Sequence, residues 1–239
     1  MIVNIAECVE GARRARGVAV VIDVFRAFSV ACHAVDNGAG EYYATADVDV
    51  ARRLAAERGG ILMGERDCIM IEGFDYGNSP TEIEGVDFAG RTLVHTTSAG
   101  TQGLLACAGA DEVITGAFVN AGAVVEYLRT SDPELVTLVA MGTGGTMRAQ
   151  EDIMCAMYLK NALEHYPNSF ETLKTFLAQV DSAQKFFDPA KTYAPERDFE
   201  LCMALDRFDF VLRATPGPDG VVKLDRVPVR PASGSASLG

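Results

Sequence analysis

Residues 17–30 read GVAVVIDVFRAFSV, and this stretch sets the expected fold. The run 18–22 is apolar throughout and rich in β-branched residues, a pattern typical of a strand buried on both faces of a sheet. The acid Asp23 follows at once, and Arg26 comes three residues later, before a helical pattern begins. An acid in this place lies at the carboxyl end of the strand, where open α/β sheets bind their ligands. A carboxylate beside a guanidinium suits a site for a metal ion and an oxyanion, although a helix-capping aspartate and a surface arginine would give the same pattern.

The composition indicates a well-packed α/β protein that does not bind nucleic acid. The chain has 239 residues, of which 49% are hydrophobic, and this is enough for one large domain with a filled core. We expect a single domain over residues 1–230 and a flexible tail over 231–239. The formal net charge of -12 argues against nucleic acid as a partner, because phosphate backbones attract basic faces. A small anionic substrate is compatible with this charge, since a local cluster of arginines and backbone N–H groups can bind one.

Cysteine usage and hydropathy predict a cytoplasmic protein without a membrane segment. The six cysteines are scattered and form no CxxC pair, which is typical of free thiols in a reducing compartment. The first residues, MIVNIAE, are too short for a signal peptide and lack its basic start. No apolar run approaches the roughly 20 residues that a membrane-spanning helix needs. The oligomeric state is left open by the sequence, with a homodimer as one option.

Strand and helix patterns alternate along the chain. Strands are expected at residues 2–5, 18–22, 41–45, 61–64, 91–95, 112–115, 135–141, 208–212 and 221–229. Helices are expected at residues 28–35, 47–58, 102–108, 116–129 and 149–164, and across 167–205 with breaks near 188–189 and 194–195. Residues 7–16 form a helix or a loop, and residues 67–90 form a long connection rich in turn residues. This alternation predicts a three-layer α/β/α fold with a mainly parallel, mixed central sheet whose last two strands are antiparallel.

Acidic residues follow three of the expected strands. These are Asp23, Glu65, Glu151 and Asp152, and in a parallel sheet they would lie along one edge. Two or three of them could hold Mg²⁺, which takes a few carboxylates together with waters and substrate oxygens. For Glu151 and Asp152, compensation of the helix dipole in a first turn explains the pattern equally well. Glu65 could instead form a simple ion pair with Arg66.

Two turns that follow strands offer places for an anion. Residues 98–101 and 142–146 would present free backbone N–H groups at the starts of helices. Neither is a P-loop, because no Lys-Ser/Thr pair follows, and ordinary turn geometry also explains both. Arg26 and Arg66 could bind phosphate or sulfonate oxygens, with structural ion pairs as the alternative. Together these parts predict a metal-assisted site that transfers a phosphoryl group from a small anionic phosphoester to water.

Other phosphatase chemistries fit the sequence less well. Phe25 occupies the position of the second acid in the aspartyl-phosphate pattern. Cys8 and Arg14 have the Cys-x5-Arg spacing of a thiolate phosphatase, but Glu10 would then lie in the anion-binding loop. The three histidines are dispersed and form no zinc-binding pair, and His95, on an apolar strand, is expected in the core.

Six ordered motifs together resemble the 2-phosphosulfolactate phosphatase family. They are VIDVFRA (21–27), GER (64–66), GFDYGNSP (73–80), TTSAGT (96–101), GAFVNA (116–121) and the run from GTGG to EDIMCA (142–156). The resemblance covers roughly residues 18–212, far more than any single glycine-rich loop would. The chain departs from the family at residues 28–30, where Phe-Ser-Val replaces a common run of threonines, and at Ala99, where asparagine is common. These departures should touch the pocket wall and affect the choice of substrate.

The resemblance implies an α/β/α fold and Mg²⁺-dependent release of phosphate from (2R)-phospho-3-sulfolactate, which yields 3-sulfolactate and in archaea serves coenzyme M biosynthesis. Together with the strand-end reasoning, it gives the expected site. Catalytic roles are expected for Asp23, Arg26, Glu65 and Arg66; substrate contacts for Asn78, Ser79, Thr97, Ser98, Gly100, Thr101, Gly142 and Thr143; and metal ligation for Asp23, Glu65, Glu151 and Asp152. The alternatives are a phosphatase for another small phosphorylated hydroxy acid and a non-catalytic anion-binding protein. Direct attack by water and a covalent phospho-enzyme both stay open.

Overall fold

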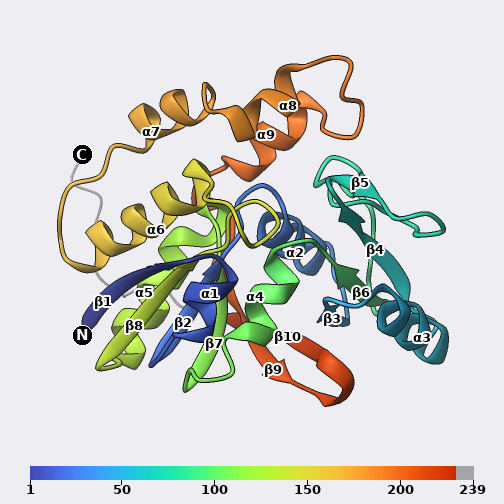
Figure 1. The fold of residues 1–239 in the computed structure, drawn as a ribbon, viewed down its shortest axis with the longest axis horizontal. Coiled ribbons are helices and arrows are strands. Elements are labelled where there is room, and N and C mark those ends of the chain that lie inside the picture. The colour runs from blue at the N-terminus through green and yellow to red at the C-terminus, as the bar shows by residue number, and fades with distance from the viewer. Residues whose placement is uncertain (230–239) are drawn as a thin grey trace.

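The computed structural model describes residues 1–229, and these residues form one ten-stranded mixed sheet with helices on both sides (Figure 1). The strands are β1 (Ile2–Glu7), β2 (Val18–Ile22), β3 (Glu41–Thr45), β4 (Ile61–Arg66), β5 (Ile69–Met70), β6 (Thr92–Thr96), β7 (Glu112–Gly116), β8 (Leu135–Ala140), β9 (Phe210–Pro216) and β10 (Val221–Pro228). Their order across the sheet is β1-β8-β2-β7-β9-β10-β3-β6-β4-β5. The predicted mainly parallel, mixed sheet is confirmed.

The sheet consists of two parallel halves joined by an antiparallel hairpin. One half is β1, β8, β2 and β7, and the other is β3, β6 and β4. The late strands β9 and β10 pair antiparallel with each other, with β7 and with β3. Three antiparallel strand pairings therefore separate the two halves. As a result, the strands of one half point in the opposite direction to those of the other. The prediction that all strand ends share one edge of a parallel sheet is wrong.

The two halves nevertheless come together around the helices between them. Sheets twist by roughly 20–25° per strand, so that the second half is rotated far from the plane of the first. The crossovers β2-α2-β3 and β6-α4-β7 pass from one half to the other, and α2 and α4 lie between the halves (Figure 1). The ends of β2, β4, β6 and β8 meet at one cavity as a result.

The helices agree with the expected pattern except at some boundaries. They are α1 (Cys8–Arg13), α2 (Ala27–Asp36), α3 (Val48–Arg58), α4 (Gly100–Ala106), α5 (Ala121–Ser131), α6 (Gln150–Leu163), α7 (Phe170–Leu177), α8 (Gln184–Phe187) and α9 (Glu196–Cys202), with 3-10 turns η1 (Phe118–Asn120), η2 (Asp181–Ala183) and η3 (Pro218–Gly220). The predicted breaks in the late helical region are confirmed, because α8 ends before Asp188 and Pro195 caps α9. The Asp47 side chain accepts the N–H groups of Asp49 and Val50, which fixes the start of α3.

Strand β2 is buried on both faces, as its apolar sequence predicts. Ala19 and Val21 pack into a cluster with α1, α2 and α4, whereas Val18, Val20 and Ile22 pack against α5 and α6. A third, smaller cluster joins α3 to β3 and β6. The helices thus cover both faces of the sheet, which makes the fold a three-layer α/β/α arrangement.

The end of β4 differs from the expected pattern, whereas two other local features agree with it. Strand β4 continues through Glu65 and Arg66, which were expected after its end, and the connection that follows contains the short strand β5. Residues 8–13 form helix α1, and the exposed Arg14 side chain lies 4.0 Å from Glu10, so that no anion-binding loop of the thiolate-phosphatase type forms there. The six cysteines, all within the described residues, are free thiols, as predicted.

The last ten residues, 230–239, lie outside the described residues, and with them the predicted tail and the final residue of the predicted domain. Within residues 1–229, no helix combines the length and the apolar character needed to cross a bilayer. The cytoplasmic location and the homodimer stay predictions.

The first prediction concerns the hairpin that joins the halves. Phe210 in β9 is fully buried, and its ring packs on Phe208 and beneath the Arg226 guanidinium. We expect Phe210→Ala to lower the free energy of unfolding by about 3–5 kcal/mol, because it leaves a cavity between the two halves. Urea unfolding measures this. Phe176→Ala is the control, since that ring is 48% exposed and should matter little; equal losses for both variants would contradict the role assigned to the hairpin.

Candidate active site

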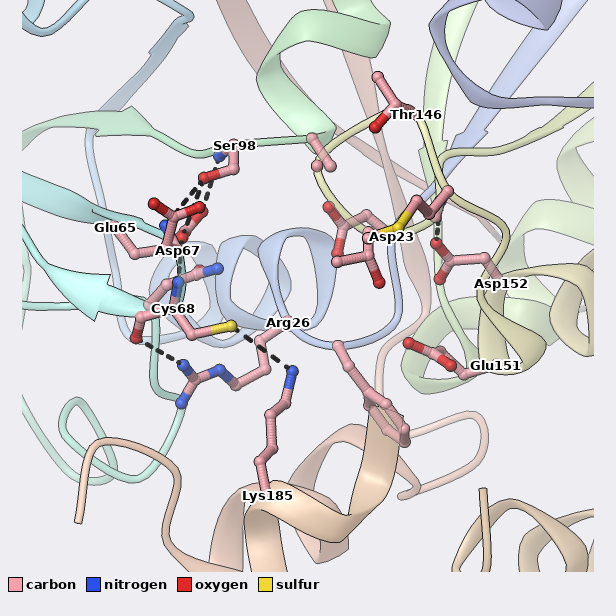
Figure 2. Close-up of a pocket in the computed structure, with 17 residues that line it drawn as sticks. Asp23, Arg26, Glu65, Asp67, Cys68, Ser98, Thr146, Glu151, Asp152 and Lys185 are labelled. Atoms are coloured by element: carbon pink, nitrogen blue, oxygen red, sulfur yellow. Dashed lines mark hydrogen bonds between the residues drawn. The ribbon is translucent and has the colours of Figure 1, made fainter. Parts of the chain in front are cut away.

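A cavity of about 280 Å³ lies where the ends of β2, β4, β6 and β8 meet (Figure 2). Its lining comprises Asp23, Phe25, Arg26, Glu65, Asp67, Cys68, Asn78, Ser98, Ala99, Gly142, Thr143, Gly144, Thr146, Met147, Glu151, Asp152 and Lys185. Nine of these were expected from the sequence: Asp23, Arg26, Glu65, Asn78, Ser98, Gly142, Thr143, Glu151 and Asp152. Five expected residues, Arg66, Ser79, Thr97, Gly100 and Thr101, do not line it.

Asp23 is the acid at the end of β2. Its Oδ1 accepts the N–H of Ala27, the first residue of α2, at 3.1 Å. The N-cap residue of α2 is Arg26, so that Asp23 is not the helix cap of the alternative interpretation. Its Oδ2 accepts no hydrogen bond from the described residues and is available to a ligand. Burial raises the pKa of Asp23 to about 7, with the nearby Glu65 and Glu151 as further causes.

Gly100 allows the two halves of the sheet to meet at Asp23. A Cβ atom at this position would lie 2.9 Å from Asp23 Oδ2 and 2.9 Å from the Cβ of Ala27. Only glycine permits this approach. Gly100 thus does not line the cavity itself, but its lack of a side chain leaves room for Asp23, which does.

Glu151 and Asp152 enter the cavity from the first turn of α6. Asp152 accepts the N–H groups of Val24 and Gly142, both at 2.8 Å, and so ties the end of β2 to the turn after β8. Glu151 accepts the hydroxyl of Ser182 at 2.5 Å. Burial is the main cause that raises the pKa of both acids, and for Asp152 repulsion by Asp23 adds to it. The predicted proximity of Asp23 and Asp152 is confirmed.

Glu65 and Arg66 lie on opposite faces of β4, because successive side chains of a strand alternate. Glu65 lines the cavity, where it accepts the N–H groups of Cys68 and Ser98, each at 2.7 Å, and the Ser98 hydroxyl. Arg66 points away and donates to Ala46 O at 2.7 Å and to Thr96 Oγ1 at 2.8 Å. Arg66 therefore links β3, β4 and β6, and the structure does not support the expected role as an anion clamp.

Arg26 lines the cavity, but its charge is already compensated. Its Nη1 lies 2.6 Å from Oδ2 of Asp198 in α9, and both side chains are buried. Asp198 Oδ1 accepts the hydroxyl groups of Ser79 and Thr81 at 2.7 and 2.6 Å and the N–H of Thr81. Ser79, expected to contact the substrate, instead helps Asp198 to position Arg26.

Asn78 is held in the cavity wall by a chain of buried polar groups. Its Oδ1 accepts from His95 Nε2 at 3.2 Å, and His95 Nδ1 lies 2.7 Å from the Tyr42 hydroxyl. Because a carboxamide oxygen can only accept, Nε2 carries the proton and Nδ1 accepts from Tyr42. His95 is a core residue, as predicted.

The two predicted anion turns contribute only in part. In the first, Thr97 and Thr101 bond reciprocally through their hydroxyls and backbone N–H groups, and Ser98 and Ala99 reach the cavity. In the second, Gly142, Gly144 and Gly145 all have positive φ, which the tight bend after β8 requires. Of the two departures from the family pattern, only Ala99 lines the cavity, whereas residues 28–30 are buried within α2.

Sequence reasoning missed Lys185 and Cys68. Lys185 comes from the four-residue helix α8, and its Nζ lies 3.9 Å from the sulfur of Cys68 in the turn between β4 and β5 (Figure 2). Neither residue belongs to a strand-end motif, so that no local pattern distinguishes it from a surface residue. Asp198 belongs to none of the six motifs, and its role as the partner of Arg26 depends on a contact between residues 172 positions apart.

The acids form no complete metal site by themselves. Within residues 1–229, no group of three or more His, Cys, Asp or Glu side chains is arranged so that it could hold a metal ion. Glu65 and Asp152 already accept hydrogen bonds at both oxygens. Asp23 and Glu151 keep one oxygen each without a donor among the described residues. This donor set fits an ion that takes one or two carboxylates and fills its other positions with water and substrate oxygens, as Mg²⁺ does.

A buried group of acids thus lies beside an arginine and a lysine at the strand ends of an α/β/α sheet, which is where proteins of this class bind their ligands. A family model described as 2-phosphosulpholactate phosphatase matches residues 4–216. The chain therefore belongs to the 2-phosphosulfolactate phosphatase family, a family of phosphatases, as the sequence motifs indicate.

Relatives in three bacteria carry the name "Probable 2-phosphosulfolactate phosphatase". The protein of Clostridium perfringens strain SM101 is 32% identical over 216 residues, which cover 84% of this chain and 87% of the relative. That of Thermotoga petrophila is 31% identical over 204 residues, covering 81% and 87%. That of Caldanaerobacter subterraneus is 33% identical over 213 residues, covering 83% and 88%.

The second prediction concerns His95. Burial lowers its pKa from 6.5 to about 3, with Arg66 as a further cause. As pH falls from 6.5 towards 3, the unfolded chain takes up a proton that the folded protein does not, so that stability falls by up to about 1.4 kcal/mol per pH unit. His95→Gln should lack this dependence, and its deficit in unfolding free energy should shrink between pH 7 and pH 4. A deficit that stays constant over this range in urea unfolding would contradict the prediction.

Proposed function

We propose that this protein hydrolyses (2R)-phospho-3-sulfolactate to 3-sulfolactate and phosphate, with Mg²⁺ as cofactor. The single observation that carries the proposal is the free Oδ2 of buried Asp23, which faces a small cavity with cations in its wall. Family membership supports the substrate, since the relatives' names specify it. The volume of about 280 Å³ suits a substrate with a three-carbon backbone.

Phosphoryl transfer needs a positioned nucleophile and charge stabilisation around the phosphoryl oxygens. In this proposal, Asp23 Oδ2 holds the metal ion that would activate the attacking water, so that the carboxylate acts in its charged form. Arg26 donates hydrogen bonds to the substrate anion from a position fixed by Asp198. Covalent attack by Asp23 is the alternative, and it places the same oxygen next to the phosphorus atom.

Asp23 and Glu151 are the ligands we propose for Mg²⁺, because each keeps an oxygen without a donor. Their raised pKa values reflect burial, and for Asp23 also the repulsion between the two acids, which a cation would relieve. When bound, Mg²⁺ would stabilise the negative charge on the phosphoryl oxygens and lower the pKa of a bound water. Asp152 would position the site through the backbone of Val24 and Gly142.

A non-catalytic anion receptor is the less favoured alternative. Five acids line the cavity, and an anion receptor gains nothing from carboxylates that repel its ligand. A phosphatase for another phosphorylated hydroxy acid differs only in the pocket wall, where Ala99 departs from the family pattern. A panel of small phosphoesters distinguishes this option.

The third prediction tests Asp23. Asp23→Asn should lower kcat/KM for phosphate release from 2-phosphosulfolactate by roughly 10²–10⁴-fold, because it removes a charged ligand of the metal ion, whose charge stabilisation is worth several kcal/mol. Phosphate release is measured directly, and circular dichroism verifies that the variant folds. Asp36→Asn, at the exposed end of α2, makes the same charge change outside the cavity and should be fully active. Turnover by Asp23→Asn at the wild-type rate would refute the assignment.

The fourth prediction tests the cofactor. Treatment with EDTA should abolish phosphate release, and added Mg²⁺ should restore it, because the cavity acids alone repel the phosphoryl group. Mg²⁺ should also raise the melting temperature of the wild type but not that of an Asp23→Asn/Glu151→Gln double variant, since a ligand stabilises only the state that binds it. Undiminished activity in EDTA would exclude metal dependence.

A further inference from the structure

The charges in the cavity wall are unbalanced. Five acids line it, namely Asp23, Glu65, Asp67, Glu151 and Asp152, whereas only two lining residues are cations. A substrate with phosphate, carboxylate and sulfonate groups adds more negative charge. The cations in the wall must therefore compensate a large part of this negative charge. A cation that is already paired with an acid of the protein can compensate less of it than an unpaired one.

Arg26 brings little net charge to the cavity, since its guanidinium is already paired with Asp198. Lys185 is different. Within residues 1–229, its ammonium forms no ion pair, and its contacts are the Cys68 sulfur at 3.9 Å and the Phe186 ring at 5.1 Å. Both contacts are weak for a cation that otherwise has water as its partner. Among the described residues that line the cavity, Lys185 is the cation that forms no ion pair, and its charge acts only at longer range, where it lowers the pKa values of Asp23 and Glu151.

Lys185 also lies in a distinct part of the cavity. Figure 2 shows Asp23, Glu151 and Asp152 on one side, and Glu65, Asp67 and Cys68 on the other. The Lys185 ammonium extends into the space between them and contacts the Cys68 side. If the phosphoryl group is bound at the free oxygen of Asp23, the other end of a small substrate lies towards Cys68 and Lys185.

We infer that Lys185 determines specificity by binding the sulfonate, one of the two anionic groups of the substrate that are not transferred. This inference depends on the proposed function and adds a named residue for the second anion. A lysine ammonium is a compact charge with three donors on a flexible stem, so that it can exchange the thiol contact for sulfonate oxygens without moving the backbone. The segment that carries α8 thus selects the substrate, whereas the strand ends act on the phosphoryl group.

The test, our fifth prediction, compares two substrates that differ in one group. 2-Phospholactate is 2-phosphosulfolactate with a hydrogen in place of the sulfonate. Lys185→Met should lose roughly 10- to 100-fold in kcat/KM on 2-phosphosulfolactate, mainly through KM, because a charge-assisted hydrogen bond is removed. On 2-phospholactate, the loss should be far smaller, because only the longer-range effect of the Lys185 charge on Asp23 and Glu151 is removed. An equal loss on both substrates, or no loss on either, would overturn the inference.

Two further variants serve as controls. Lys191→Met removes the same charge from the same segment outside the cavity, where Lys191 lies near Asp188, and should equal the wild type on both substrates. Lys185→Arg keeps the charge and should recover part of the preference for the sulfonated substrate. Thermal unfolding shows whether each variant is folded.

Calorimetry with the product separates the inference from the proposed function. 3-Sulfolactate should bind the wild type roughly 10- to 100-fold more tightly than Lys185→Met, and lactate should show no such difference. If the wild type releases no phosphate from either phosphoester, the proposed function fails, and the binding difference still decides the role of Lys185. Equal affinity of wild type and variant for 3-sulfolactate would refute that role.

Discussion

The buried ion pair between Arg26 and Asp198 is the interaction on which the cavity depends. It joins the end of β2 to α9, and through Ser79 and Thr81 it also fixes the long connection after β5. Two buried charges are costly unless both are paired and hydrogen-bonded, and here the Asp198 carboxylate accepts from four donor groups. One contact therefore sets the position of Arg26 and, through the neighbouring Ser79, that of Asn78 in the wall.

The ion pair between Arg26 and Asp198 also explains why the cations near the cavity have different roles. Because the Asp198 carboxylate already neutralises the Arg26 guanidinium, Arg26 offers directed hydrogen bonds to a ligand but little net charge. Arg66 is withdrawn to link three strands, and Lys185 is left without an acid partner. Opposite them, burial and repulsion by neighbouring acids raise the pKa values of Asp23 and Asp152. Such crowding destabilises the folded chain, and it is expected where acids serve a cation and a substrate rather than the fold.

Much of the fold follows from local sequence. The apolar run of β2, the glycine after α3 and the prolines near α8 and α9 specify where elements begin and end, because these signals act over a few residues. The insertion of the β9–β10 hairpin into the middle of the sheet does not follow from them, since strand order is set by pairings between distant segments. The opposite directions of the two parallel halves were missed for the same reason.

The sequence alone determined that acids, arginines and glycine turns follow buried strands, and hence that a phosphoryl-transfer site of a known family was to be expected. It identified Asp23, Glu65, Glu151 and Asp152, since each lies in or beside a strand-end motif. The tertiary structure alone decided that Arg66 faces away, that Asp198 holds Arg26, and that Lys185 and Cys68 enter the cavity. The physical reason is that a motif fixes which chemical group follows a strand. The direction of a side chain and its partner depend instead on strand alternation, sheet twist and contacts between residues more than a hundred positions apart.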